Sequence, residues 1–166
     1  MEKLPVDLPD HPDGWIITDR YFPNTRLRLR HMRSISGKEN MYKLTQKYRS
    51  ETQDAYETIV TNEYLTEAEY NFFEPLEARI LRKKRYPYTV QNHSLSIDVF
   101  EGRHQGLILA EMEMENKEEA YQLVLPPFML RDVTKDPFFT GGNLVAITDE
   151  EFKQGLLQRL HNPKNL

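Results

Sequence analysis

The sequence contains no cysteine, no long apolar run and no segment with the character of a signal peptide. Without cysteine the chain can form neither disulfide bonds nor thiolate sites, which fits an intracellular protein. The opening residues, MEKLPVDLPDHPDGW, have no apolar core of signal-peptide length. No apolar stretch approaches the length of a membrane span. We therefore expect a cytoplasmic protein that does not enter membranes.

Several common catalytic and cofactor motifs are also missing. There is no Walker loop and no GxGxxG fingerprint. Three serines, Ser34, Ser36 and Ser50, stand outside any nucleophile motif, and the five histidines lack the spacing of metal ligands. Gly141 and Gly142 are interpreted as a turn. The sequence thus gives no support for classical nucleotide, dinucleotide, serine-hydrolase or zinc chemistry.

What is present suits one polar globular domain over residues 1–166, with 39% hydrophobic and 29% charged residues. The net charge of −4 is unevenly distributed. Residues 20–85 hold 14 Lys and Arg against 9 Asp and Glu, whereas the segments on both sides are acidic. Binding to nucleic acid normally needs a broadly basic surface. An acidic protein with a basic middle instead predicts a site for a small anion and no nucleic-acid partner.

Most of the chain alternates between apolar and polar residues with the period of two that is typical of β-strands. Strands are predicted over residues 15–21, 25–33, 41–50, 55–65, 78–86 and 107–116, with either two strands or one bent strand over 89–102. The breakers between residues 36 and 40 predict a hairpin between the second and third strands. Many antiparallel strands with few helices predict an α+β fold that is mainly antiparallel β, with the sheet closing as a barrel.

Helices are predicted where capping boxes occur. Thr66 followed by Glu69 begins a short helix that runs to about Glu74, and Thr148 followed by Glu151 begins a terminal helix. The terminal helix carries one apolar stripe, formed by Phe152, Leu156, Leu157 and Leu160. Asn116 to Glu119 is a further candidate cap, and residues 126–145 are predicted to be a loop with short strand pieces.

The segment LILAEMEMEN, residues 107–116, places Glu111, Glu113 and Glu115 on one face of a strand. By itself this pattern is typical of a half-buried strand whose glutamates face water. The cationic rows elsewhere in the chain change that interpretation. They recur at the same period on three other strands: Arg26, Arg28 and Arg30; Lys43, Lys47 and Arg49; Lys83 and Arg85.

Rows of one charge sign are unfavourable unless they face each other or a ligand, because buried ions without partners are costly. Arginine and lysine bind phosphate oxygens through charge-assisted hydrogen bonds. Glutamates bind Mg²⁺ or Mn²⁺, hard cations that prefer carboxylate and phosphate oxygen. The four rows together predict an interior that binds a polyphosphate with a divalent cation. An exposed face for each row remains the alternative, and it predicts no polyphosphate binding.

The chain resembles the CYTH domain, that is, the triphosphate tunnel metalloenzyme superfamily. The resemblance is carried, in family order, by DRYFPNTRLRLR (19–30), YKLTQKYR (42–49), ILRKKRY (80–86), IDVFEGRHQGLILAEMEME (97–115) and DVTKDPFFTGGNL (132–144). It implies a single CYTH-like domain: an eight-stranded antiparallel barrel that forms a tunnel, with short flanking helices. It also implies a metal-dependent triphosphatase, a hydrolase that uses Mg²⁺ or Mn²⁺.

The resemblance also assigns roles to residues. The triphosphate-binding residues it implies are Arg28, Arg30, Lys47, Lys83 and Arg85. Glu111 and Glu113 are implied as the catalytic, metal-binding pair, with Asp98 as a further metal ligand in the tunnel and Glu115 on the same face. The substrate is open between inorganic triphosphate, thiamine triphosphate and nucleoside triphosphates, because these share the same charged portion.

One part of the family pattern is missing. The family's first strand has the form ExExK, and this sequence has no such motif; it begins with MEKLPVDLP, which resembles the segment after that strand. Either the strand is encoded upstream of Met1 or the protein lacks it. If it is lacking, the barrel is incomplete, and its open edge favours pairing between two chains as a homodimer. The alternative function is then a non-catalytic protein that binds polyphosphate or nucleotides and has lost the ExExK metal site.

Overall fold

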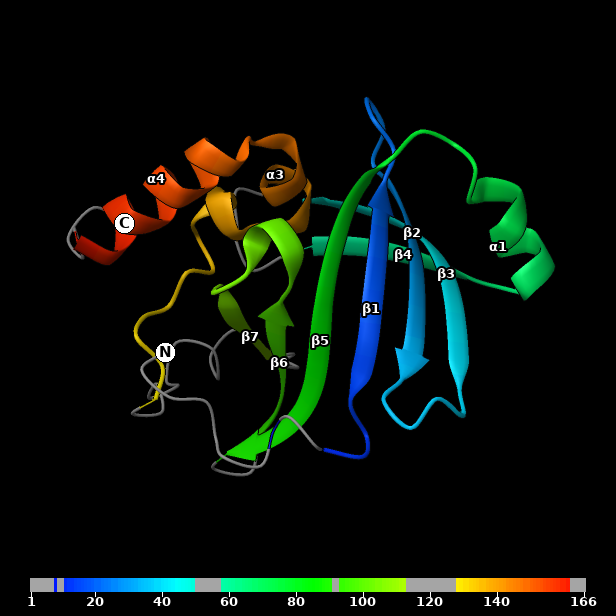
Figure 1. Cartoon of the computed structure of the whole chain (residues 1–166), viewed down its shortest axis with the longest axis horizontal. Helices are drawn as coiled ribbons and strands as arrows, with labels where there is room; N and C mark the ends of the chain where they lie inside the picture. The colour runs from blue at the N-terminus through cyan, green and yellow to red at the C-terminus, as the bar shows by residue number, and fades with distance from the viewer. Residues whose placement is uncertain (1–7, 9–10, 50–57, 91–92, 113–127, 162–166) are drawn as a thin grey trace.

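The computed structural model describes residues 8, 11–49, 58–90, 93–112 and 128–161. Its centre is a curved sheet of seven described strands, in the spatial order β4-β3-β2-β1-β5-β6-β7 (Figure 1). The strands are β1 Trp15–Tyr21, β2 Leu27–Ser34, β3 Asn40–Arg49, β4 Thr58–Leu65, β5 Arg79–Val90, β6 His93–Phe100 and β7 Ile108–Met112. Every neighbouring pair is antiparallel. The predicted fold class is confirmed, with seven strands described where the resemblance implies eight.

The strand register decides which side chains share a face. Asp19 lies opposite Arg30 across β1 and β2, and Arg85 lies opposite Asp98 across β5 and β6. Because directly opposed residues point to the same side of a sheet, these charged residues share one face, which we call the inner face. On the other face of β5 and β6, Tyr86, Leu95 and Ile97 form an apolar cluster with Leu8.

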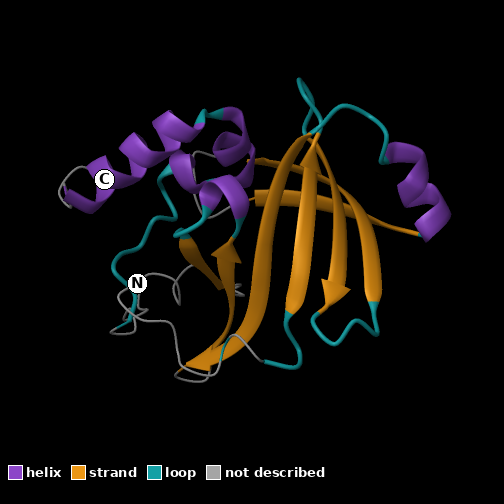
Figure 2. Cartoon of the chain, viewed as in Figure 1, coloured by secondary structure: helices purple, strands orange, loops and turns teal. Residues whose placement is uncertain are grey.

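Helices lie at the two ends of the sheet, in purple in Figure 2. Helix α1, Glu67–Phe73, begins with the predicted capping box of Thr66 and Glu69. Helix α4, Asp149–His161, begins with the equivalent bonds between Thr148 and Glu151. Both predicted helix starts are therefore confirmed. None of the helices in the described ranges is long and apolar enough to span a membrane.

The predicted loop over residues 126–145 is confirmed over 128–136 and wrong over most of 137–145. A 3₁₀ turn, η2, covers Pro137–Phe139, and helix α3 covers Gly141–Ala146, so Gly141 and Gly142 begin a helix instead of forming a turn. Packing outweighs the weak helix propensity of glycine here, because Leu144 and Val145 are buried against Leu81 and Phe100 of the inner face. These contacts place α3 and η2 over one end of that face.

The two glycines of α3 allow a matched test of this packing. A Cβ at Gly141 would collide with the Tyr21 hydroxyl, whereas a Cβ at Gly142 meets nothing within 4 Å. Gly141→Ala is expected to lower the free energy of unfolding by about 1–3 kcal/mol through overpacking. Gly142→Ala is expected to raise it by about 0.4–1 kcal/mol by reducing the freedom of the unfolded chain. Urea unfolding of both variants measures the difference; equal effects would show that α3 does not pack against Tyr21.

Three further predictions differ from the structure in detail. Strand β5 continues past Tyr86 through Pro87, at a point beyond the end of β1, where the missing proline N–H is not needed for pairing on that side. Of the predicted segment 89–102, residues 89 and 90 end β5 and residues 93–100 form β6, so its described strand residues belong to two strands. In α4, Phe152 is buried but Leu157 and Leu160 are exposed, so the apolar stripe is covered only over its first half. The helix cap predicted at residues 116–119 lies outside the described residues.

Candidate functional site

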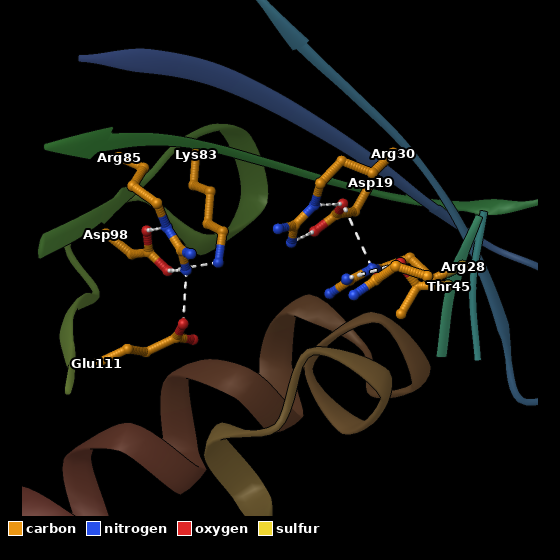
Figure 3. A network of polar contacts seen from close by, with 9 residues as sticks. Asp19, Arg28, Arg30, Thr45, Lys83, Arg85, Asp98 and Glu111 are labelled. Carbon is orange, nitrogen blue, oxygen red and sulfur yellow. Dashed lines mark hydrogen bonds and ion pairs between the residues drawn. The ribbon is translucent and has the colours of Figure 1, made fainter. Parts of the chain in front are cut away.

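The inner face carries a network of charged side chains from both halves of the sheet (Figure 3). Its members are Asp19, Arg28, Arg30, Thr45, Lys83, Arg85, Asp98 and Glu111. They come from β1, β2, β3, β5, β6 and β7, so the sheet brings together residues that are up to 92 positions apart. The network consists of two clusters, each organised around a buried aspartate.

The first cluster is centred on Asp19 of β1, which is fully buried. Arg30 donates two hydrogen bonds to its carboxylate, from Nε to Oδ1 at 2.6 Å and from Nη2 to Oδ2 at 2.7 Å. Arg28 lies further away, with its Nε 3.7 Å from Asp19 Oδ1 and its Nη2 donating to Thr45 Oγ1 at 3.3 Å. Among the described residues, Arg28 Nε is a buried donor without a hydrogen-bond acceptor. Arg30 is thus fixed by its partner, whereas Arg28 keeps an unused donor.

The electrostatics of this cluster follow from its burial. Burial raises the pKa of Asp19, but the charge and hydrogen bonds of Arg30 outweigh it and hold the pKa below its usual value. The same partner raises the pKa of Arg30 despite the opposing effect of burial. Asp19 was not identified from the sequence as a site residue. The available signal was an acidic residue in the middle of WIITDRY, at a position that alternation places on the same face as Trp15 and Ile17.

The second cluster is centred on Asp98 of β6, which is also fully buried. Arg85 donates from Nε to Oδ1 and from Nη2 to Oδ2, both at 2.7 Å, and Lys83 forms a short contact with Oδ2. Burial lowers the pKa of Lys83 more than the carboxylate raises it. For Arg85, the carboxylates of Asp98 and Glu111 outweigh burial, and the pKa is raised. Both oxygens of Asp98 are therefore used by cations.

Glu111 joins this cluster from β7, where its Oε2 accepts a hydrogen bond from Arg85 Nη2 at 2.6 Å. Its side chain is 55% exposed, in contrast to the two buried aspartates. Burial of the carboxyl group raises the pKa, but Lys83 and Arg85 lower it by more, to about 2. Glu111 is consequently an anion at neutral pH. Glu113 and Glu115 lie outside the described residues.

The two clusters face the same space beside α3, as Figure 3 shows. The electrostatic influence of one cluster reaches the other: Arg85 lowers the pKa of Arg30, and Lys83 lowers that of Asp19. Lys47 of β3 also lowers the pKa of Glu111, although its own side chain is exposed. The structure thus places six of the sequence-predicted site residues in one network, and Lys47 stands two positions after Thr45 on the same face of β3.

The described carboxylates do not by themselves form a metal centre. Within the described ranges, no group of three His, Asp or Glu side chains is placed to hold a metal ion. Asp98, predicted as a metal ligand, has both oxygens occupied by Lys83 and Arg85. A divalent cation needs several oxygen ligands, and Glu111 alone supplies too few. The described carboxylates alone therefore do not account for binding of a divalent cation.

Comparisons with known proteins bear on this arrangement. No family model matches the chain. It is 30% identical over 78 residues to a protein named inorganic triphosphatase from Acetivibrio thermocellus, a match that covers 47% of this chain and 49% of that protein. The chain thus spans about half the length of the curated relative it matches.

Solved structures share the fold. The crystal structure of the inorganic triphosphatase NE1496 aligns with a TM-score of 0.55 and 22% identity, over 81% of this chain and 87% of that one. A second crystal structure, of the hypothetical protein NE1496, gives a TM-score of 0.54 at the same identity. The sequence match and the shared fold confirm the predicted resemblance to the triphosphate tunnel metalloenzyme superfamily, and the chain has the fold of these solved structures.

Proposed function

We propose that the inner face binds the triphosphate portion of a small molecule. The observation that carries this proposal is the excess of cations: Arg28, Arg30, Lys83 and Arg85 face only three described carboxylates in one network. An anionic ligand with several charges balances this excess. The planar arginine side chains suit phosphate oxygens, which they bind through paired hydrogen bonds. Among these four cations, Arg28 is the one whose Nε has no hydrogen-bond acceptor among the described residues.

The activity proposed for this site is hydrolysis of a triphosphate, either inorganic triphosphate or a thiamine or nucleoside triphosphate. Two of the similar proteins are named inorganic triphosphatases, which supports this reaction type. Phosphoryl transfer is catalysed mainly by positioning and by stabilising the charge on the phosphate oxygens. Arg28, Lys83 and Arg85 would perform these tasks here. A bound Mg²⁺ or Mn²⁺ would supply further charge neutralisation, with Glu111 and Glu113 as its proposed ligands.

A second candidate, binding of polyphosphate or nucleotides without hydrolysis, is favoured by one observation. The carboxylate of Asp98 already accepts contacts from two cations, Lys83 and Arg85. Under this candidate the cationic network retains its ligand while the chemical step is absent.

Phosphate release separates the two candidates. The wild-type protein is incubated with tripolyphosphate, ATP or thiamine triphosphate in the presence of Mg²⁺, Mn²⁺ or EDTA. We expect release with a divalent cation, and a fall of at least about tenfold in the Glu111→Ala, Glu113→Ala double variant, as for loss of charge stabilisation at a reacting group. Release no greater than that of the double variant would exclude hydrolysis by this chain. Tripolyphosphate binding without release would support the second candidate.

A further inference from the structure

The three described carboxylates of the inner face differ in how firmly they are held. Asp19 and Asp98 are 1% and 0% exposed, and each accepts a bidentate pair of hydrogen bonds from one arginine. Glu111 is 55% exposed, and Arg85 is its ion-pair partner among the described residues. Breaking a buried ion pair leaves an uncompensated charge, and this cost is smaller when one partner, here Glu111, reaches water. Glu111 is therefore the carboxylate that a competing anion can replace.

Arg85 is the cation at which this replacement would occur. Its Nε and Nη2 are both engaged by Asp98, which fixes the guanidinium plane. Its Nη2 also donates to Glu111 at 2.6 Å, and its side chain is 20% exposed. A phosphate oxygen has the same charge sign and accepts the same hydrogen bonds as the Glu111 carboxylate. The two anions therefore compete for one side of a guanidinium that is already oriented.

We propose that Glu111 is an internal counter-ion of Arg85 that a phosphate group displaces, so that the inner face binds polyphosphate without a metal ion and Glu111 limits the affinity. The proposal rests on the proposed function insofar as the ligand is a polyphosphate, but it requires no hydrolysis. It also accounts for why the described carboxylates are paired with cations and form no metal centre. Asp98 keeps Arg85 and Lys83 in position. In the absence of ligand, Glu111 accepts the hydrogen bond from Arg85 that a phosphate oxygen would accept in the complex.

Calorimetric titration with tripolyphosphate in EDTA tests this proposal. Glu111→Gln removes the competing charge while keeping the shape of the side chain. We expect it to bind tripolyphosphate about two- to fivefold more tightly than wild type, the range that corresponds to releasing an ion pair with one partner in water. Glu101→Gln is the matched control. Glu101 forms an ion pair with Lys84 at 3.3 Å, both side chains are partly exposed, and neither residue belongs to the network. This control makes the same change in net charge and is expected to leave the affinity unchanged.

The role of Arg85 is tested by repeating the substitution in an Arg85→Gln background, after thermal unfolding has confirmed that the double variant is folded. The gain from Glu111→Gln is expected to disappear there, because no guanidinium remains to be freed. Persistence of the gain would overturn the pairing with Arg85. Equal or weaker binding by Glu111→Gln, or wild-type binding that requires Mg²⁺, would overturn the proposal as well. Tighter tripolyphosphate binding by Glu111→Gln, in a protein that releases no phosphate, would support the counter-ion role of Glu111 and exclude only hydrolysis.

Discussion

Replacing Asp98 with alanine is expected to lower the free energy of unfolding by about 3–5 kcal/mol, the cost of leaving buried charges without a partner. Asp98 is completely buried and neutralises both Lys83 and Arg85, whose own side chains are only 6% and 20% exposed. Without the carboxylate, two cations that stand two residues apart on the same face of β5 would repel each other in a poorly hydrated setting. Urea unfolding followed by circular dichroism measures the loss.

Asp149→Ala provides the comparison for this variant. Asp149 also forms an ion pair, with Arg103 Nε at 2.9 Å, but its side chain is 68% exposed. Exposed pairs contribute about 0–1 kcal/mol, so the control is expected to unfold close to the wild-type midpoint. Similar losses in the two variants would mean that burial of Asp98 does not set its contribution.

Arg28 and Arg30, which stand two residues apart on the same face of β2, are expected to give opposite results when each is replaced with alanine. Arg30→Ala leaves Asp19 buried without its two hydrogen bonds and is expected to destabilise the protein by about 3–5 kcal/mol. Arg28→Ala removes an arginine with an unused buried donor and is expected to change stability far less. It is expected to weaken tripolyphosphate binding by about 10- to 150-fold, as for loss of a hydrogen bond to a charged group worth about 1.5–3 kcal/mol.

Measuring unfolding and tripolyphosphate binding on both variants gives the comparison. Arg33→Ala is a suitable control, because Arg33 lies on the opposite face of β2 and is exposed. It is expected to affect neither quantity by more than the scatter of surface substitutions, about 0.5 kcal/mol. Unchanged tripolyphosphate affinity in Arg28→Ala would remove the inner face of β2 from the binding site.

Sequence patterns predicted the parts of this structure that depend on local rules. The two-residue alternation of TRLRLRHMR and MYKLTQKYRS predicted two paired strands, because side-chain direction in a strand is fixed by the backbone alone. The capping boxes at Thr66 and Thr148 predicted the starts of α1 and α4, because their hydrogen bonds join residues three positions apart. Helix α3 was missed, because its two leading glycines suggest a turn and its stability comes from packing against distant residues.

The candidate site shows the same division. The charge rows identified Arg28, Arg30, Lys83, Arg85 and Glu111, because a row is visible within one strand. Asp19 escaped detection because it is a single acidic residue in its strand, and its importance arises only when β1 pairs with β2. The sequence also did not predict which cation pairs with each carboxylate. Asp98 is predicted as a metal ligand, and the register of β5 against β6 sets it opposite Arg85, a pairing that the charge rows do not predict.

The sequence by itself determined which residues share a face of each strand and where two helices begin. It also showed that rows of cationic and acidic side chains occur on strands of the same domain. These features follow from backbone geometry and from hydrogen bonds between near neighbours. Only the tertiary structure decided which charges pair, which arginine keeps an unused donor, and which carboxylate stays exposed. The physical reason is that pairing and burial depend on strand register and on the packing of α3, and both are set by contacts between residues far apart in the chain.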